Sequence, residues 1–156
     1  MKSKIWLVLI IYAWLPSCSK NMQQEVAETW PGGQPKKVFF YETAGEKRDK
    51  VMEVRYFQTG NKEMEGHFKN GRKEGTWTFW FENGKRQSEN NFRNDLRDGK
   101  STVWRENGYK YYEGTYSMGK LHGTWIFYDT DGRRIKEVIF EHDVKVREAE
   151  FQVPLI

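Results

Sequence analysis

The stretch Gly75-Thr-Trp-Thr-Phe-Trp-Phe-Glu-Asn-Gly84 decides the fold of this chain, because it recurs in register. Shifted by 24 residues, it returns as Gly99-Lys-Ser-Thr-Val-Trp-Arg-Glu-Asn-Gly108 and again as Gly123-Thr-Trp-Ile-Phe-Tyr-Asp-Thr-Asp-Gly132. A fixed period of this length is the signature of a repeat architecture, in which each unit packs mainly on its neighbours.

Each repeat predicts two strands joined by a hairpin. The Thr, Trp and Phe residues of 76–82 suit a pleated, half-buried surface. Asn83-Gly84 predicts a type I′ turn, as do Asn107-Gly108 and Asp131-Gly132, whereas the second connection, such as 70–75, is expected to be longer. No segment keeps helical spacing of apolar residues. We predict an all-β fold: a single, elongated antiparallel meander of repeated hairpins with about nine or ten strands, twisted or partly rolled.

Aromatic residues supply most of the expected core, because leucine is rare after the first 17 residues. Residues in a strand alternate between the two faces, so Trp77 and Trp80 point in opposite directions. Rings therefore load both faces, and one face could stay open for binding. The candidate binding residues are Trp80, Trp104, Tyr128, Trp77 and Trp125.

The N-terminal region predicts an exported lipoprotein. Lys2 and Lys4 precede an apolar run over 5–15, too short for a membrane span and typical of a signal peptide. The following Leu15-Pro16-Ser17-Cys18 resembles a bacterial lipobox, although Pro16 departs from the usual pattern. This resemblance implies cleavage before Cys18, the only cysteine, and attachment of lipid to its sulfur. The alternative is an ordinary secretory signal.

The chain then divides into three parts: a signal peptide over 1–17, a lipidated Cys18 with a flexible tether through 36, and a β-repeat domain over 37–153. The tether is expected from its polar composition and from its Pro and Gly residues. Within the domain, Val38–Tyr41 is the expected first strand, an irregular loop covers 42–50, and 144–153 supply a last, more polar strand.

Two segments, Met64-Glu-Gly-His-Phe-Lys-Asn-Gly-Arg-Lys-Glu-Gly75 and Tyr112-Glu-Gly-Thr-Tyr-Ser-Met-Gly-Lys-Leu-His-Gly123, resemble the MORN repeat, in its bacterial variant. Proteins with this variant are often labelled antitoxin-like. The resemblance implies scaffolding, partner binding or lipid association, and no catalysis. The middle unit departs from the pattern, with Asn90 in place of Gly and Ser101 in place of Trp. Its regular curvature is therefore left open by the sequence.

No catalytic or metal site is predicted. Equivalent glutamates (Glu65, Glu89, Glu113 and Glu137) lie two strands apart, or about 9.6 Å, at the outer limit for a glycosidase pair. Cross-strand ion pairs with recurring cations, such as Arg86, explain them better. The three histidines occupy different repeat phases, so they are not expected to stack or to bind metal. No cofactor is expected, and the net charge of +4 is too small to indicate nucleic acid.

The leading hypothesis is a non-enzymatic, lipid-anchored protein of the bacterial cell envelope, expected in the outer membrane, on either its periplasmic or its surface side. Its sheet would bind another protein. The first alternative is a carbohydrate-binding lipoprotein that uses the aromatic ladders. The second is an antitoxin-like inhibitor of a partner protein, which export would separate from cytosolic toxins.

Overall fold

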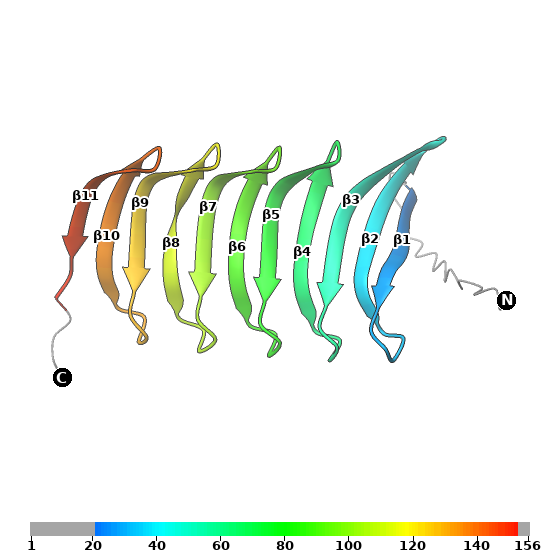
Figure 1. Ribbon diagram of the computed structural model, residues 1–156, viewed down its shortest axis with the longest axis horizontal. Helices are drawn as coiled ribbons and strands as arrows, with labels where there is room; N and C mark the ends of the chain where they lie inside the picture. The colour runs from blue at the N-terminus through cyan, green and yellow to red at the C-terminus, as the bar shows by residue number, and fades with distance from the viewer. Residues whose placement is uncertain (1–20, 153–156) are drawn as a thin grey trace.

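The computed structural model describes residues 21–152, and all their regular structure is β-strand. Eleven strands form one sheet in which each strand pairs antiparallel with the next along the chain (Figure 1). The predicted all-β meander of hairpins is confirmed. Among the residues described, no helix is long and apolar enough to cross a membrane. The strands are β1 (Asn21–Thr29), β2 (Pro35–Ala44), β3 (Lys47–Tyr56), β4 (Lys62–Lys69), β5 (Arg72–Trp80), β6 (Arg86–Arg93), β7 (Leu96–Trp104), β8 (Lys110–Ser117), β9 (Lys120–Tyr128), β10 (Arg134–Glu141) and β11 (Val144–Glu150).

The predicted tether is wrong for Asn21–Thr29, because these residues form β1 on the edge of the sheet. Asn21 pairs with Thr43 and Val26 with Val38, so the expected first strand is the second. The expected loop over 42–50 is also wrong, since these residues complete β2 and β3 around a short turn. The polar side chains of β1 are mostly exposed, which explains why no apolar alternation predicted it.

The prediction of type I′ turns at the Asn83-Gly84 set of connections is wrong, because that geometry occurs in the alternate connections. Both turn residues have positive φ at Asn70-Gly71 (52° and 75°) and at Met118-Gly119 (47° and 85°), where a two-residue turn joins the strands. At Asn83-Gly84 only the glycine has positive φ, and Gly84 N–H donates to the Phe81 carbonyl. These wider turns include one additional residue, because a glycine bulge follows a normal β-turn.

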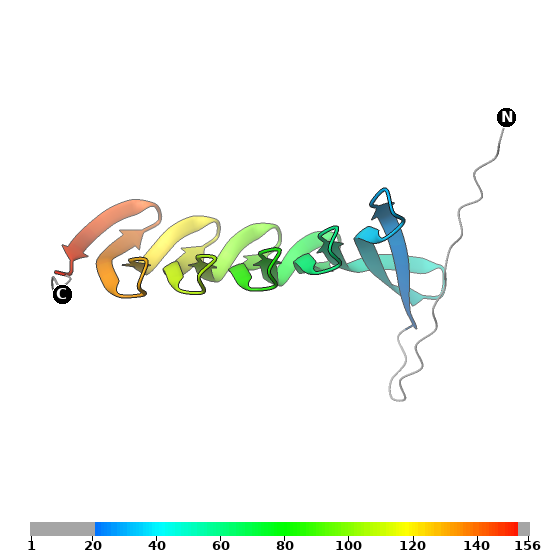
Figure 2. The same cartoon turned by 90° about the horizontal axis from the view of Figure 1, so that it is seen from below.

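Each regular odd-numbered strand, β5, β7 and β9, bends at a glycine that immediately precedes its central residue. Gly75, Gly99 and Gly123 have φ values of 71°, 107° and 69°, and pairing with the preceding strand is irregular at each of them. A bulge of this kind bends a strand and increases its twist. The later hairpins consequently form a curved, regular row, whereas the β1–β2 ribbon is turned away from it (Figure 2).

The core occupies both faces of the sheet. On one, the Trp77 face, Trp77 and Trp125 are 3% and 4% exposed, and their rings lie over Gly66 and Gly114. On the other, the Trp80 face, Val54 is buried, and so is Tyr128, which forms an aromatic column with Trp80 and Trp104. Aliphatic residues thus share the core with the rings that were expected to dominate it.

The irregular middle unit is compensated locally. Ser101, equivalent to Trp77 and Trp125, lies opposite Asn90, which replaces the glycine under the ring. Its hydroxyl donates a buried hydrogen bond of 2.8 Å to the Asn90 side-chain oxygen. Two polar side chains that bond each other substitute for a ring on a glycine, and the sheet continues without interruption.

Candidate functional site

The predicted binding residues do not form one open surface. Trp77 and Trp125 are core residues, each with an indole N–H that donates to a backbone carbonyl of the preceding strand, at 3.1 and 3.2 Å. Tyr128 is also buried, at 8% exposed. Trp80 and Trp104 are half-buried on the opposite face from Trp77. These two rings alone keep the accessibility that a ligand platform needs.

The glutamate column pairs mainly along its own strands rather than across them. Glu65, Glu89 and Glu113 each bind the cation three residues earlier, at 2.6, 3.0 and 2.9 Å. Residues three apart in a strand normally lie on opposite faces of the sheet. A bulge follows each cation, so the cation and its glutamate lie on the same face. One cross-strand contact, from Lys100 to Glu113 at 3.2 Å, fits the predicted arrangement.

Glu113 is the most strongly stabilised carboxylate of the column. Burial opposes its ionisation, but hydrogen bonds from Tyr128, Lys110 and Lys100 outweigh burial and lower the pKa of Glu113 to about 2. Tyr128 donates at 2.5 Å, and burial and this bond raise the pKa of its hydroxyl. The carboxylate is therefore held ionised within its ion pairs, which does not suit a proton-transfer role.

The prediction that the histidines do not stack is wrong for one pair. The rings of His122 and His142 lie 5.0 Å apart, because the β10–β11 turn folds back onto β9. Residues 21–152 contain no group of three metal-binding side chains.

Three of the tight turns dock on the preceding repeat by the same backbone bond. Asp95, Gly119 and Asp143 donate N–H to the carbonyls of Lys73, Arg97 and Leu121, at 3.1, 2.7 and 2.9 Å. The Asp95 and Asp143 carboxylates also accept the N–H of Lys73 and Leu121, each at 2.8 Å. These contacts close the spaces between successive turns.

The first tight turn lacks this contact. No hydrogen bond joins Gly71 to the equivalent Asp49 within the part of the chain that the structure describes. The β3–β4 ladder ends at Met52–His67, so residues 47–50 of β3 pair with β2 alone, and Val51 is a bulge in that pairing. The sheet therefore contains a free strand edge at the point where the β2–β3 hairpin diverges from the later repeats (Figure 1).

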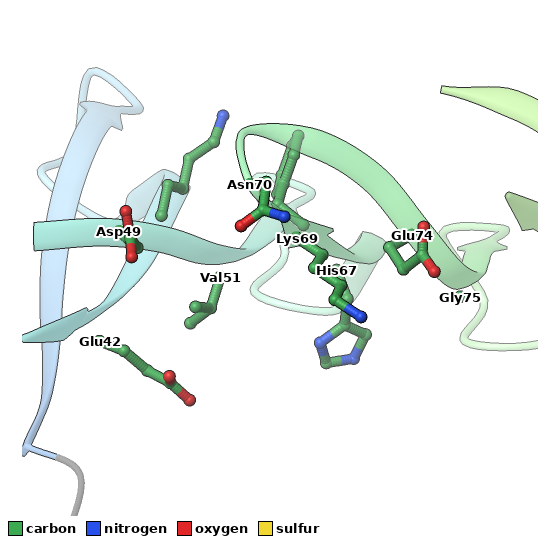
Figure 3. Close-up of a pocket in the computed structure, with 10 residues that line it drawn as sticks. Glu42, Asp49, Val51, His67, Lys69, Asn70, Glu74 and Gly75 are labelled. Atoms are coloured by element: carbon green, nitrogen blue, oxygen red, sulfur yellow. The ribbon is translucent and has the colours of Figure 1, made fainter. Parts of the chain in front are cut away.

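A pocket of about 480 Å³ occupies this divergence, and we call it the junction pocket. Its size falls in the range of roughly 300–1,000 Å³ that ligand sites occupy. Figure 3 shows its lining, from Glu42 on β2, past Val51 on β3, to His67 on β4 and Glu74 on β5. No sequence pattern predicted it, because it arises where a turn fails to dock.

The lining of the junction pocket is part apolar and part charged. Lys50 Nζ lies 3.8 Å from the centre of the Phe68 ring, which forms one wall. Lys69 and Asn70 form the rim toward the turn, and Lys69 is exposed. Glu74 accepts a hydrogen bond of 3.2 Å from Asn94 N–H, so part of its capacity is already used. Such a lining suits an extended peptide with side chains of both signs.

Comparison with known protein families identifies one segment of the chain. The family model described as "MORN repeat variant" matches residues 73–94, which span most of β5, the Asn83-Gly84 turn and β6. No curated protein matches the chain. The chain therefore carries a MORN repeat variant at residues 73–94, inside the row of bent hairpins that lies beside the junction pocket.

Proposed function

We propose that this protein is a non-enzymatic, lipid-anchored protein of the bacterial envelope whose sheet binds another protein. MORN repeats are generally modules for protein or membrane interaction, which supports a scaffold role. The observation that carries the proposal is the free edge of β3 over 47–51, beside a pocket of about 480 Å³.

The partner is expected to dock an extended segment on this edge. An unpaired strand edge binds such a segment through main-chain hydrogen bonds, while neighbouring pockets select its side chains. In the junction pocket, the Phe68 ring offers an apolar contact. Asp49 and Lys69 offer charges of opposite sign on the rim. These contacts bind the segment without any covalent reaction.

A photo-crosslinking amino acid at position 69 tests the site in the full-length, membrane-associated protein. We expect one discrete crosslinked protein, which unlabelled protein competes away. The same crosslinking amino acid at position 120 is the matched control, because Lys120 is exposed and directly follows a docked turn. Equal crosslinking from both positions, or none from position 69, would overturn the proposed site.

Closing the junction pocket gives a second test. Gly71→Asp supplies the carboxylate that Asp95 and Asp143 use to dock their turns, so it should reduce partner binding. Gly119→Asp is the matched control, because Gly119 also has positive φ and its turn is already docked at 2.7 Å. Both variants carry the same backbone cost, so only loss confined to Gly71→Asp supports the proposal.

The lipid anchor is tested separately, because Cys18 lies outside the described residues. Acyl groups on a thioether-linked lipid would hold the protein on a membrane, with each buried CH₂ contributing about 0.8 kcal/mol. Metabolic labelling with a radioactive fatty acid should mark the wild-type chain and not Cys18→Ala. Label retained by the variant would refute the anchor.

A further inference from the structure

A second pocket, of about 160 Å³, lies beside Trp104 on the Trp80 face. Its walls come from four successive strands, β5 to β8, in the middle of the repeat row. Trp104 is half-buried and provides the apolar wall, while Asn91, Lys100, Glu89 and Lys110 provide polar groups. We call this the Trp104 pocket; it shares no lining residue with the junction pocket.

The polar side chains of the Trp104 pocket are held in place by one another. Thr76 Oγ1 donates to Asn91 Oδ1 at 2.9 Å, and Asn91 Nδ2 donates to the Lys100 carbonyl at 2.9 Å. The Lys100 and Lys110 ammonium groups share one oxygen of Glu113, at 3.2 and 2.9 Å. A ligand would therefore meet side chains that are already ordered, which reduces the entropy lost on binding.

The Glu89 carboxylate is oriented in the same way, by Arg86 at 3.0 Å. Lysine has three donors and a carboxylate about four acceptor positions, so these ion pairs leave capacity for a ligand. Positively charged donors, such as Lys100, and the negatively charged acceptor Glu89 thus line the same pocket as the Trp104 ring. Hydroxyl groups both donate and accept, whereas an anionic ligand would be repelled by Glu89 and a cationic ligand by Lys100 and Lys110.

We propose that the Trp104 pocket is a subsite for one pyranose unit of a neutral oligosaccharide. The apolar C–H face of the sugar stacks on the Trp104 ring, and its hydroxyls bond Asn91, Lys100 and Glu89. The pocket has room for a single ring of this kind. The proposal is independent of protein binding at the junction pocket.

The aromatic column sets the direction in which the chain of sugars runs. Trp80 is the next ring of the column, two strands away, or about 9.6 Å along the sheet. In a β-1,4-linked chain every second sugar presents the same face, at a spacing close to this distance. Tyr128, on the other side, is 8% exposed and donates its hydroxyl to Glu113. The oligosaccharide therefore extends from Trp104 toward Trp80 across the strands.

Calorimetric titration of the full-length protein with cellohexaose and with chitohexaose tests the proposal. At least one should bind, and Trp104→Ala should weaken it by about tenfold or more, the effect expected for loss of one stacked ring. Trp104→Tyr should retain most of the affinity. Lys100→Met, at an exposed position, should weaken binding several-fold without loss of the fold.

Tyr109→Ala is the control, because Tyr109 is 52% exposed and lies outside the pocket lining. It should bind as the wild type does. No heat from either hexasaccharide at millimolar concentration would overturn the proposal. Wild-type affinity in folded Trp104→Ala, checked by circular dichroism, would overturn it as well.

Discussion

Replacing Gly66 by Asn together with Trp77 by Ser should cost less stability than the two single changes added. A Cβ at Gly66 would lie 2.1 Å from Trp77 Cδ2, so any side chain there displaces the indole. The next repeat already contains the proposed pair, because Asn90 and Ser101 lie opposite each other and bond at 2.8 Å. The exchange therefore copies a solution that this sheet uses one repeat further along.

The magnitudes follow from what each change removes. Trp77→Ser deletes a ring that is 3% exposed and packs edge-on against Phe68 and Phe92, at 5.2 and 5.9 Å, so it should cost about 3–5 kcal/mol. Gly66→Asn forces a side chain into a filled position and should cost about 1–3 kcal/mol. In the double variant the overlap is absent and a new hydrogen bond forms. We expect a favourable coupling of about 2 kcal/mol.

Urea unfolding followed by far-ultraviolet circular dichroism measures the coupling without relying on the tryptophan that is lost. Gly71→Asn combined with Trp77→Ser is the control, because a Cβ at Gly71 meets nothing within 4 Å. The control pair should be additive within about 0.5 kcal/mol. If Gly66→Asn and Trp77→Ser are equally additive, the ring does not determine the residue opposite it and our account of the repeat is wrong.

Three further predictions concern single positions. Hydrogen bonds lower the pKa of Glu113 to about 2 from an ordinary value of 4.5, so the ionised carboxylate stabilises the fold fully above pH 4.5, and this stabilisation is lost as the pH falls toward 2. The thermal unfolding midpoint should therefore fall less between pH 4.5 and pH 2 in Glu113→Gln than in the wild type, and an equal fall would contradict this. Met118→Asn should raise the free energy of unfolding by about 1 kcal/mol, because φ at Met118 is 47° and Asn adopts this conformation more readily; an unchanged thermal midpoint would refute it. Asp95→Ala should cost about 1 kcal/mol and speed amide exchange at Lys73, whose N–H the carboxylate accepts at 2.8 Å, and unaltered exchange would argue against the docking contact.

The repeat was predictable because its signals are local. Glycine marks most of the turns and the bulges of β5, β7 and β9, and alternation assigns Trp77 and Trp80 to opposite faces, as the structure confirms. The first hairpin was missed because β1 is polar. The sequence does contain its turn glycine, Gly33: in the structure Gly33 N–H donates to the Trp30 carbonyl at 2.8 Å, as Gly60 N–H does to the Phe57 carbonyl at 2.9 Å. A three-residue shift of the frame hides this equivalence.

The Asn-Gly dipeptide alone did not predict which turns have type I′ geometry. Asn-Gly occurs at 70–71 with type I′ geometry and at 83–84 without it, so the flanking pairing determines the turn. The same limit applies to the aromatic column. Trp104 and Tyr128 hold equivalent positions, yet Tyr128 is buried against Glu113 while Trp104 lines a pocket.

The sequence by itself thus determined the period, the all-β class and the alternation of side chains, because each depends on a few adjacent residues. The tertiary structure decided which rings remain accessible and where the sheet opens. The junction pocket exists because Gly71 does not dock on Asp49, although Asp95, Gly119 and Asp143 dock on their equivalents. That difference depends on the path of a neighbouring hairpin, because Gly119 has the same residue type at this position and still docks.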